Sequence, residues 1–138
     1  MKKATTTDHG SEKLLEKRKK QAGVWLDHRQ AVMVSAPEGE FAIAGNFETT
    51  APEHHRTSEY TINQAEKALT LKHFHAVAAQ LAPYDHILLF GPGTAQEEMR
   101  NLLSDDVHFR GKQFVLDAAS HMTPNQVLAK VRDFFKTA

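Results

Sequence analysis

The chain contains no cysteine, which excludes disulfide frameworks, thiolate zinc sites and cysteine nucleophiles. Long hydrophobic runs are also missing. The longest, such as Ile87–Phe90, are far shorter than the roughly 20 residues that cross a bilayer. The N-terminus lacks the apolar segment that is typical of a signal peptide. We therefore expect a cytoplasmic protein that does not engage membranes.

The chain also has no overall excess of charge of either sign, because 17 Lys and Arg balance 17 Asp and Glu. This balance hides an asymmetry: residues 1–20 carry a net charge of +4, and the remainder carries −4. Nine histidines would add positive charge as the pH falls below about 6.5. At neutral pH the body is thus not expected to bind polyanions in general, whereas the basic leader could.

The length of 138 residues, with 41% hydrophobic and 25% charged residues, is typical of one globular domain. We expect residues 22–138 to form this domain and residues 1–21 to be a disordered or partly helical leader. The stretch Ser11–Lys20 has helix-forming residues but too few apolar positions to bury a face. It is interpreted either as an RNA-binding arm or as a solubilising tail.

The domain opens with short apolar runs. Gly23–Asp27 and Ala31–Ser35 are strand-like, and the polar residues between them make either a hairpin or a break in one long strand. After a Pro-Glu-Gly turn, Glu40–Ala44 alternates as a half-buried strand does. An antiparallel meander is therefore predicted.

A long polar stretch, Asn46–Glu59, follows, and connections of this length are uncommon unless they are functional or disordered. Apolar residues then recur at three- and four-residue spacings and predict a helix over Ala65–Leu81, stopped by Pro83. The continuous apolar run His86–Phe90 is typical of a strand buried on both faces.

The remaining segments continue the alternation. Thr94 with Glu97 three residues later predicts a capping box at the start of a helix. Gln113–Leu116 is predicted to be another short buried strand, and Thr123 followed by Pro124 predicts the start of the last helix. The order β-β-β-α-β-α-β-α predicts an α/β fold with a ribonuclease H-like mixed five-stranded sheet flanked by helices.

Two motifs carry a resemblance to a family. The strand Val24–Leu26 runs into Asp27-His28-Arg29-Gln30-Ala31, and the strand His86–Phe90 runs into Gly-Pro-Gly. With these motifs in register, Gly23–Phe135 resembles the middle domain of eukaryotic and archaeal class I peptide-chain release factors and of Pelota. It is more similar still to short bacterial translational machinery proteins related to that domain.

The sequence departs from this family at two positions. The release factors carry a Gly-Gly-Gln tripeptide, which promotes peptidyl-tRNA hydrolysis, in the loop that corresponds to Asn46–Glu59. This chain has His54-His55-Arg56 there and no Gly-Gly-Gln. The family also often has a lysine three residues after the Gly-Pro-Gly, where this chain has Gln96.

The resemblance implies a translation-associated protein that binds ribosomal or transfer RNA without catalysing peptide release. No catalytic residue and no cofactor are expected. The candidate RNA-contacting side chains are those of the loop and the leader, since Arg and His contact phosphates or stack on bases. They are His54, His55, Arg56, Lys17, Arg18, Lys19 and Lys20. The alternative for the loop is a solvated, variable connection.

The Gly-Pro-Gly turn has two interpretations. Backbone amides at the start of the following helix could hold a phosphate. Alternatively, the turn is a structural signature of the fold, made by Gly91, Pro92, Gly93 and Thr94. We favour the structural role because no lysine follows and Glu97 and Glu98 would repel phosphate.

Two further hypotheses remain open. A small metal-dependent nuclease or other hydrolase would use Asp27, Asp85 and Asp117 around divalent metals, but turn aspartates are favoured, with Asp27 paired to Arg29. His73 and His75 are two positions apart and do not make a chelating pair, so surface histidines and no metal site are expected. The third hypothesis is a homodimeric protein-interaction module joined through a sheet edge.

Overall fold

A computed structural model describes residues 20–36, 39–49 and 58–137. The strands are β1 (Gln21–Leu26), β2 (Gln30–Ser35), β3 (Ala42–Glu48), β4 (His86–Gly91) and β5 (Gln113–Ala118). The helices are α2 (Glu59–Leu81), α3 (Ala95–Ser104), the short 3-10 helix η1 (Val107–Phe109) and α4 (Pro124–Thr137). Among these described helices, none is both long enough and apolar enough to cross a membrane.

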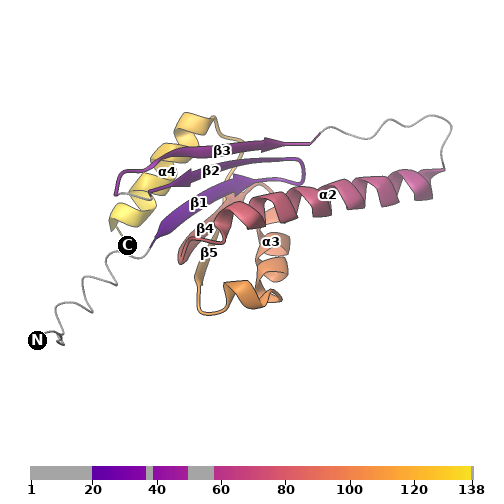
Figure 1. The fold of residues 1–138 in the computed structure, drawn as a ribbon. Coiled ribbons are helices and arrows are strands. Elements are labelled where there is room, and N and C mark those ends of the chain that lie inside the picture. Colours follow the sequence, from indigo (N-terminus) through magenta and orange to yellow (C-terminus); the bar gives the residue numbers. More distant parts are fainter. Residues whose placement is uncertain (1–19, 37–38, 50–57, 138) are drawn as a thin grey trace, which may run out of the picture.

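The strands form one mixed sheet in the order β3-β2-β1-β4-β5 (Figure 1). β1 is antiparallel to β2 and parallel to β4, and β4 is parallel to β5. The first two apolar runs are therefore a hairpin, whose turn is closed by the Asp27 amide donating to the Gln30 carbonyl at 2.9 Å. The predicted α/β class, with a meander followed by β/α alternation, is confirmed.

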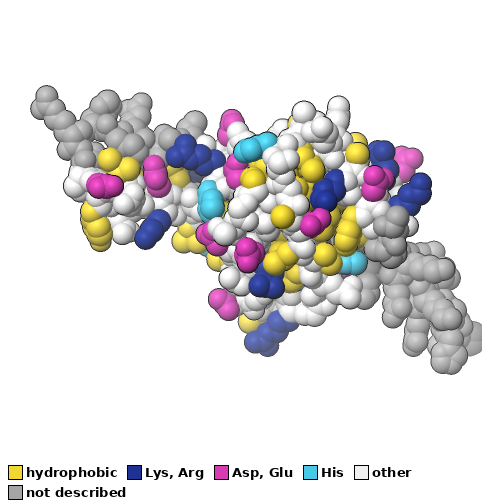
Figure 2. Space-filling model, turned by 180° about the vertical axis from the view of Figure 1, so that it is seen from behind, with side chains coloured by type: hydrophobic (Ala, Val, Ile, Leu, Met, Phe, Trp, Pro, Cys, Tyr) yellow, Lys and Arg dark blue, Asp and Glu magenta, His cyan; other side chains and the backbone are white. Residues whose placement is uncertain are grey.

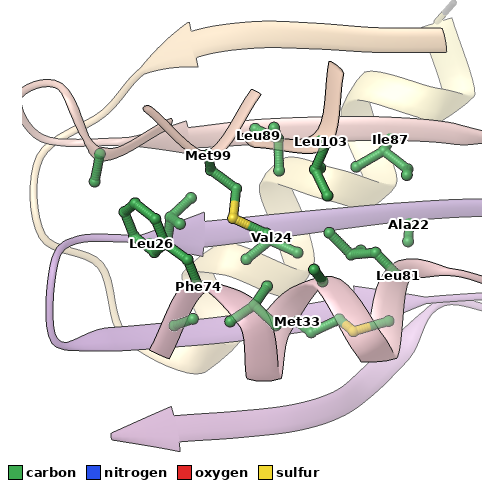
Figure 3. Close-up of a cluster of buried hydrophobic side chains, with 14 of the residues drawn as sticks. Ala22, Val24, Leu26, Met33, Phe74, Leu81, Ile87, Leu89, Met99 and Leu103 are labelled. Atoms are coloured by element: carbon green, nitrogen blue, oxygen red, sulfur yellow. The ribbon is translucent and has the colours of Figure 1, made fainter. Parts of the chain in front are cut away.

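The sheet is covered on both faces, and β4 shows this most clearly. Ile87 and Leu89 point into a cluster beneath α2 and α3, together with residues such as Phe74 (Figure 3). Leu88 and Phe90 point to the opposite face, where α4 covers them. Because both faces are buried, β4 is apolar throughout, as the sequence predicted.

Close contact between the sheet and α4 depends on a glycine in β1. A Cβ atom added to Gly23 would meet the side chain of Val131, which is fully buried in α4. The absence of a side chain at this position therefore lets α4 lie close against the central strand.

Several boundaries differ from those predicted. α2 begins at Glu59 rather than Ala65, and β3 extends to Glu48, so the polar stretch contributes residues to both elements. β5 is an edge strand whose central residues are only half-buried, so its prediction as a buried strand was wrong. His73 is 1% exposed, which overturns its prediction as a surface histidine, while His75 is exposed.

The two predicted caps have different outcomes. At α4, Thr123 and Gln126 form a reciprocal capping box, in which each side chain accepts from the other residue's amide, at 3.2 and 2.9 Å. At α3 the predicted box is absent: the Thr94 hydroxyl donates to Glu98 at 2.8 Å, not to the helix backbone or Glu97. Glu98 competes for this hydroxyl because it lies one turn further along the same face.

Candidate binding groove between α2 and α3

Most residues proposed from the sequence to contact RNA lie outside the described part of the chain. These are Lys17, Arg18, Lys19, His54, His55 and Arg56. Lys20 is described and is exposed. Its amide donates to an Asp85 carboxylate oxygen at 3.3 Å, and its carbonyl accepts the amides of Asp85 and His86 at 2.8 and 3.1 Å. The backbone of Lys20 is thereby part of the folded domain.

The chain enters and leaves segment 50–57 at one end of the molecule, where α2 extends past the strands (Figure 1). The amide of Thr49, just after β3, donates to the carbonyl of Arg29 in the β1–β2 turn at 2.8 Å. Ser58 caps α2, because its side-chain oxygen accepts the amide of Thr61 at 3.2 Å. Both ends of the segment are thus anchored by hydrogen bonds at this projecting end.

The first half of α2 leaves the body because its inward face is polar. The buried residues of α2 all lie in its C-terminal part: His73, Phe74, Val77, Ala78 and Leu81. At 100° per residue, the same face continues toward the N-terminus with polar side chains. These are Thr70, Lys67, Glu66 and Asn63. Since they cannot be buried in an apolar core at low cost, the helix stands away and a space opens beneath it.

This space is a groove of about 860 Å³ between α2, α3 and the β1–β2 turn. α3 turns one face toward it with Glu98 and Asn101, and Asp105, which caps the C-terminus of α3, continues this face. Phe74 and Leu102 supply apolar surface. The lining therefore combines an apolar part with hydrogen-bonding and charged groups, as ligand-binding and docking sites do.

A chain of side-chain contacts crosses the groove from the β1–β2 turn to α3. His28 Nε2 lies 2.8 Å from Glu98 Oε2, which also accepts the Thr94 hydroxyl at 2.8 Å. The His28 ring stacks over Phe74, with centroids 6.1 Å apart and an interplanar angle of 28°. The hydrogen bond from His28 is the main cause that lowers the pKa of Glu98. Glu98 therefore remains an anion that orients the imidazole.

The adjacent turn is held by Asp27, whose carboxylate accepts the amides of Arg29 and Gln30 at 2.8 and 2.7 Å. The expected pairing of Asp27 with Arg29 is thus a hydrogen bond from the backbone amide of Arg29 and not from its side chain. The Arg29 guanidinium lies instead 3.8 Å from Glu66 on α2. Both side chains of this pair are about half exposed, so its contribution to stability is small.

The groove does not have the charge expected of a phosphate-binding surface. Its ionisable lining residues, besides His28, are Arg29, Lys67, Glu66, Glu98 and Asp105. With His28 neutral they sum to −1. On the face seen in Figure 2, acidic and basic side chains are interspersed rather than gathered by sign. A polyanion would therefore gain little electrostatic free energy in this groove.

His73 lies beneath the β1–β2 turn and is the most deeply buried histidine among the described residues. The backbone carbonyls of Asp27 and Gln30 lie close to its ring, and Nε2 has no hydrogen-bond partner. Burial is the largest influence and lowers the pKa of His73, since it disfavours the imidazolium form. The residue thus supports the turn that carries His28 as a neutral, buried ring.

The aspartates considered for a nuclease all have other partners. The carboxylates of Asp27 and Asp85 accept backbone amides. Asp117 accepts Lys130 Nζ at 2.8 Å, which is the main cause that lowers the pKa of Asp117. Within residues 20–36, 39–49 and 58–137, no group of three or more His, Asp or Glu side chains could hold a metal ion. In the described structure these three carboxylates are thus engaged by backbone amides and in an ion pair.

The Gly91–Thr94 turn shows strong backbone constraints. A Cβ atom on Gly91 would collide with the carbonyl oxygen of Leu26, and Gly93 has a φ of +89°. Gln96 follows, 4% exposed, and its amide donates to the carbonyls of Gly91 and Asp117 at 3.2 and 3.3 Å. In this chain Gln96 thus joins β4 to β5, and Thr94 is turned toward Glu98.

The contact of His28 with Glu98, and the groove beside it, were missed from the sequence. From the sequence, His28 and Arg29 were predicted to belong to a polar turn, and Glu98 was considered only as a group that repels phosphate. One signal was present: the inward stripe of α2 changes from apolar to polar before His73. The contact itself joins residues 70 positions apart, which local patterns do not reveal.

No family model matches the chain, and no curated protein sequence is significantly similar to it. Solved structures do resemble it. An archaeal translation termination factor superposes with a TM-score of 0.58 and 15% identity over 92% of this chain and 37% of its own. Pelota from Archaeoglobus fulgidus superposes with a TM-score of 0.56 and 14% identity over 94% of this chain and 37% of its own.

Pelota from Thermoplasma acidophilum gives a TM-score of 0.53 and 14% identity over 98% of this chain and 39% of its own. At these identities the likeness shows a common fold. The resemblance to release factors and Pelota that the sequence indicated is thereby confirmed at the level of the fold. The chain spans less than two fifths of the length of each of these proteins.

Proposed function

We propose that the protein is a translation-associated binding domain that contacts ribosomal or transfer RNA and does not hydrolyse peptidyl-tRNA. The observation that carries this proposal is the fold, which resembles that of an archaeal translation termination factor over 92% of the chain. A shared fold does not define a function, so the proposal is assigned to particular side chains and tested there.

RNA contact is assigned to segment 50–57 and to the basic leader. His54, His55 and Arg56 stand between Thr49 and Ser58, the two anchored ends of this segment at the projecting end. The leader adds the cluster Lys17–Lys20. The groove is not assigned a contact with RNA, because its net charge is negative and the affinity for RNA increases with the number of phosphates neutralised.

The test is co-sedimentation of the full-length protein with ribosomes at increasing salt concentration. We expect the wild type to sediment with ribosomes at low salt and to be released as salt rises. Arg56→Ala should weaken binding and make the slope of log K against log salt less steep by about one unit. Replacing Lys17, Arg18, Lys19 and Lys20 with alanine should make this slope less steep by several units.

The matched control is Arg132→Ala, which removes one exposed cation from α4, away from the projecting end. It should leave both the affinity and the salt slope unchanged. Migration of the wild type with free protein at low salt would refute the proposal. Equal losses for Arg56→Ala and Arg132→Ala would show that binding is a general charge effect.

A further inference from the structure

The groove beneath α2 does not end at the cavity described above. A second cavity of about 380 Å³ shares Leu102 and Asp105 with the first one and continues between α2 and α3 to η1. Two large apolar side chains lie beside this path and are exposed: Leu71, 49%, and Val107, 60%. The α2–α3 groove, defined by the linings of these two cavities, therefore presents apolar surface that no described element covers.

Charge is distributed unevenly along the α2–α3 groove. At its outer end, beside the β1–β2 turn, the cations Arg29 and Lys67 are balanced by the carboxylates of Glu66 and Glu98. Its inner end, beside η1, carries the carboxylates of Asp105 and Asp106. Hydrogen bonds from the amide and ring of His108 lower the pKa of Asp106 and keep it ionised. An occupant of matching chemistry would be basic at the inner end and apolar in the middle.

The leader of this chain has these features in this order. Counting back from the folded domain, it presents the basic run Lys17-Arg18-Lys19, then Glu16, then Leu14-Leu15, and then the oppositely charged residues Lys13 and Glu12. Placed with its basic run at the inner end, the leader would bring Leu14 and Leu15 to the apolar middle. Glu12 and Lys13, which are of opposite charge, would then lie at the outer end, where the charges of the lining balance.

The leader also starts at the correct end of the groove. Lys20 contacts Asp85, and the Asp85 carbonyl accepts the amide of Gln113, the first residue of β5, just beyond η1. An extended chain advances about 3.3 Å per residue, so residues 12–19 cover roughly 26 Å. This exceeds the roughly 20 Å spanned by the six residues of β1, which is the length of the sheet along this strand.

We propose that residues Glu12–Lys19 dock into the α2–α3 groove of the same chain, with Leu14 and Leu15 against the apolar surface around Leu102. Because the segment is tethered at Lys20, its effective concentration at the groove is in the millimolar range, and even a weak contact is populated. The proposal concerns the protein without RNA and is independent of the function proposed above.

The absence of cysteine makes this proposal directly testable in the full-length protein. A variant with Leu15→Cys and Asn101→Cys places one thiol on the leader and one on the exposed face of α3 that lines the groove. Under mild oxidation we expect an intramolecular disulfide. The matched control combines Leu15→Cys with Ala129→Cys, an exposed position on α4, on the opposite face of the sheet. Disulfide formation should be at least tenfold slower there.

A charge exchange tests the register. Lys17→Glu and Asp105→Lys should each slow formation of the disulfide between positions 15 and 101, and the two changes together should restore it. Asp105 is exposed, so Asp105→Lys should preserve folding, and circular dichroism verifies the fold of each variant. Equal rates at positions 101 and 129, or no rescue by the double exchange, would overturn the proposal.

Disulfide-linked dimers in place of an intramolecular product would also overturn it, because they would place the leader in the groove of a second copy. The assay contains no RNA. A negative result therefore leaves the ribosome experiment standing, and loss of ribosome binding leaves the docking proposal standing.

Discussion

His73 lies at the junction between the buried part of α2 and the turn that carries His28. Its neighbours in the inward stripe, Val77 and Leu81, follow at intervals of four residues, so its position in the helix dictates burial. A neutral imidazole is tolerated there, whereas an imidazolium would have to be desolvated. The nearby charge of Asp27 opposes this effect but is the weaker influence.

This burial predicts an acid-sensitive contribution to stability. The pKa of His73 in the folded protein lies below its ordinary value of 6.5, so the unfolded chain takes up the proton first as the pH falls. Stability should therefore decrease below about pH 6.5 and continue to decrease until the folded-state pKa is passed. The free energy of unfolding in urea would be measured at pH 7.5 and at pH 5.5. Between these two pH values it should decrease less for His73→Gln than for the wild type.

The control is His75→Gln, an exposed position two residues further along the same helix. It should retain the pH dependence of the wild type. If His73→Gln and the wild type show the same dependence on pH, burial of His73 is not its source.

At the residue level, the sequence is most informative where one residue has one local role. The capping role of Thr123 follows from its position before Pro124. The burial of His73 was missed because a polar residue was judged by its type and not by its place in the stripe. Thr94 was misassigned because Glu97 and Glu98 are both within reach of it, and only the structure selects Glu98.

At the scale of elements, α2 consists of two parts with different sources of stability. Residues after Thr70 are held by the core, while the part before it depends on local helix interactions and the cap at Ser58. An isolated helix of about 12 residues is marginal in water. The first part should therefore open without global unfolding.

Hydrogen exchange tests this division. Amides between Ile62 and Thr70 should exchange faster than those between Phe74 and Leu81. Ser58→Ala should speed exchange in the first part by up to about tenfold, since an N-cap contributes about 1 kcal/mol, and leave the global unfolding midpoint unchanged.

Thr123→Ala is the matched variant, because Thr123 caps α4, whose Val127 and Val131 are fully buried. It should lower the global free energy of unfolding by about 1 kcal/mol. A global loss of that size for Ser58→Ala would contradict the separation of α2 into two parts.

The start of α2 could not be placed from apolar periodicity. Residues before Ala65 show no apolar stripe, because they do not pack against the core. The core-facing strands behaved in the opposite way: β4 is buried on both faces, so composition alone was sufficient to identify it. Periodicity reports burial, and in α2 it therefore located the part that packs against the core but not the start of the helix.

For the whole molecule, the order of elements was sufficient to predict the sheet. Hairpin connections place β1, β2 and β3 side by side, and parallel strands joined by helices follow a right-handed rule, which leaves few arrangements. The groove was not predictable in this way. It is assembled from the β1–β2 turn, α2 and α3, which approach one another only after the sheet has formed.

The proposed function makes a negative prediction for the whole protein. The full-length protein should not accelerate release of peptide from peptidyl-tRNA on the ribosome, because it lacks the Gly-Gly-Gln that the release factors use. Peptide release would be measured with ribosomes that carry a labelled peptidyl-tRNA, with a class I release factor as the positive control. Release above the rate without added protein would contradict the proposal.

The central position of β1 has a consequence for how the protein is made. β1 pairs on one side with β2, which follows it directly, but on the other side with β4, where Gln21 is matched to His86, 65 positions later. The hairpin can form within microseconds, whereas a ribosome needs roughly 3 to 13 s to synthesise that span at about 5–20 residues per second. During this interval the newly made hairpin has an open strand edge. A β4 segment from a neighbouring nascent chain would fit that edge as well as the chain's own, so β1 is open to competing strand pairing until its own β4 has been made.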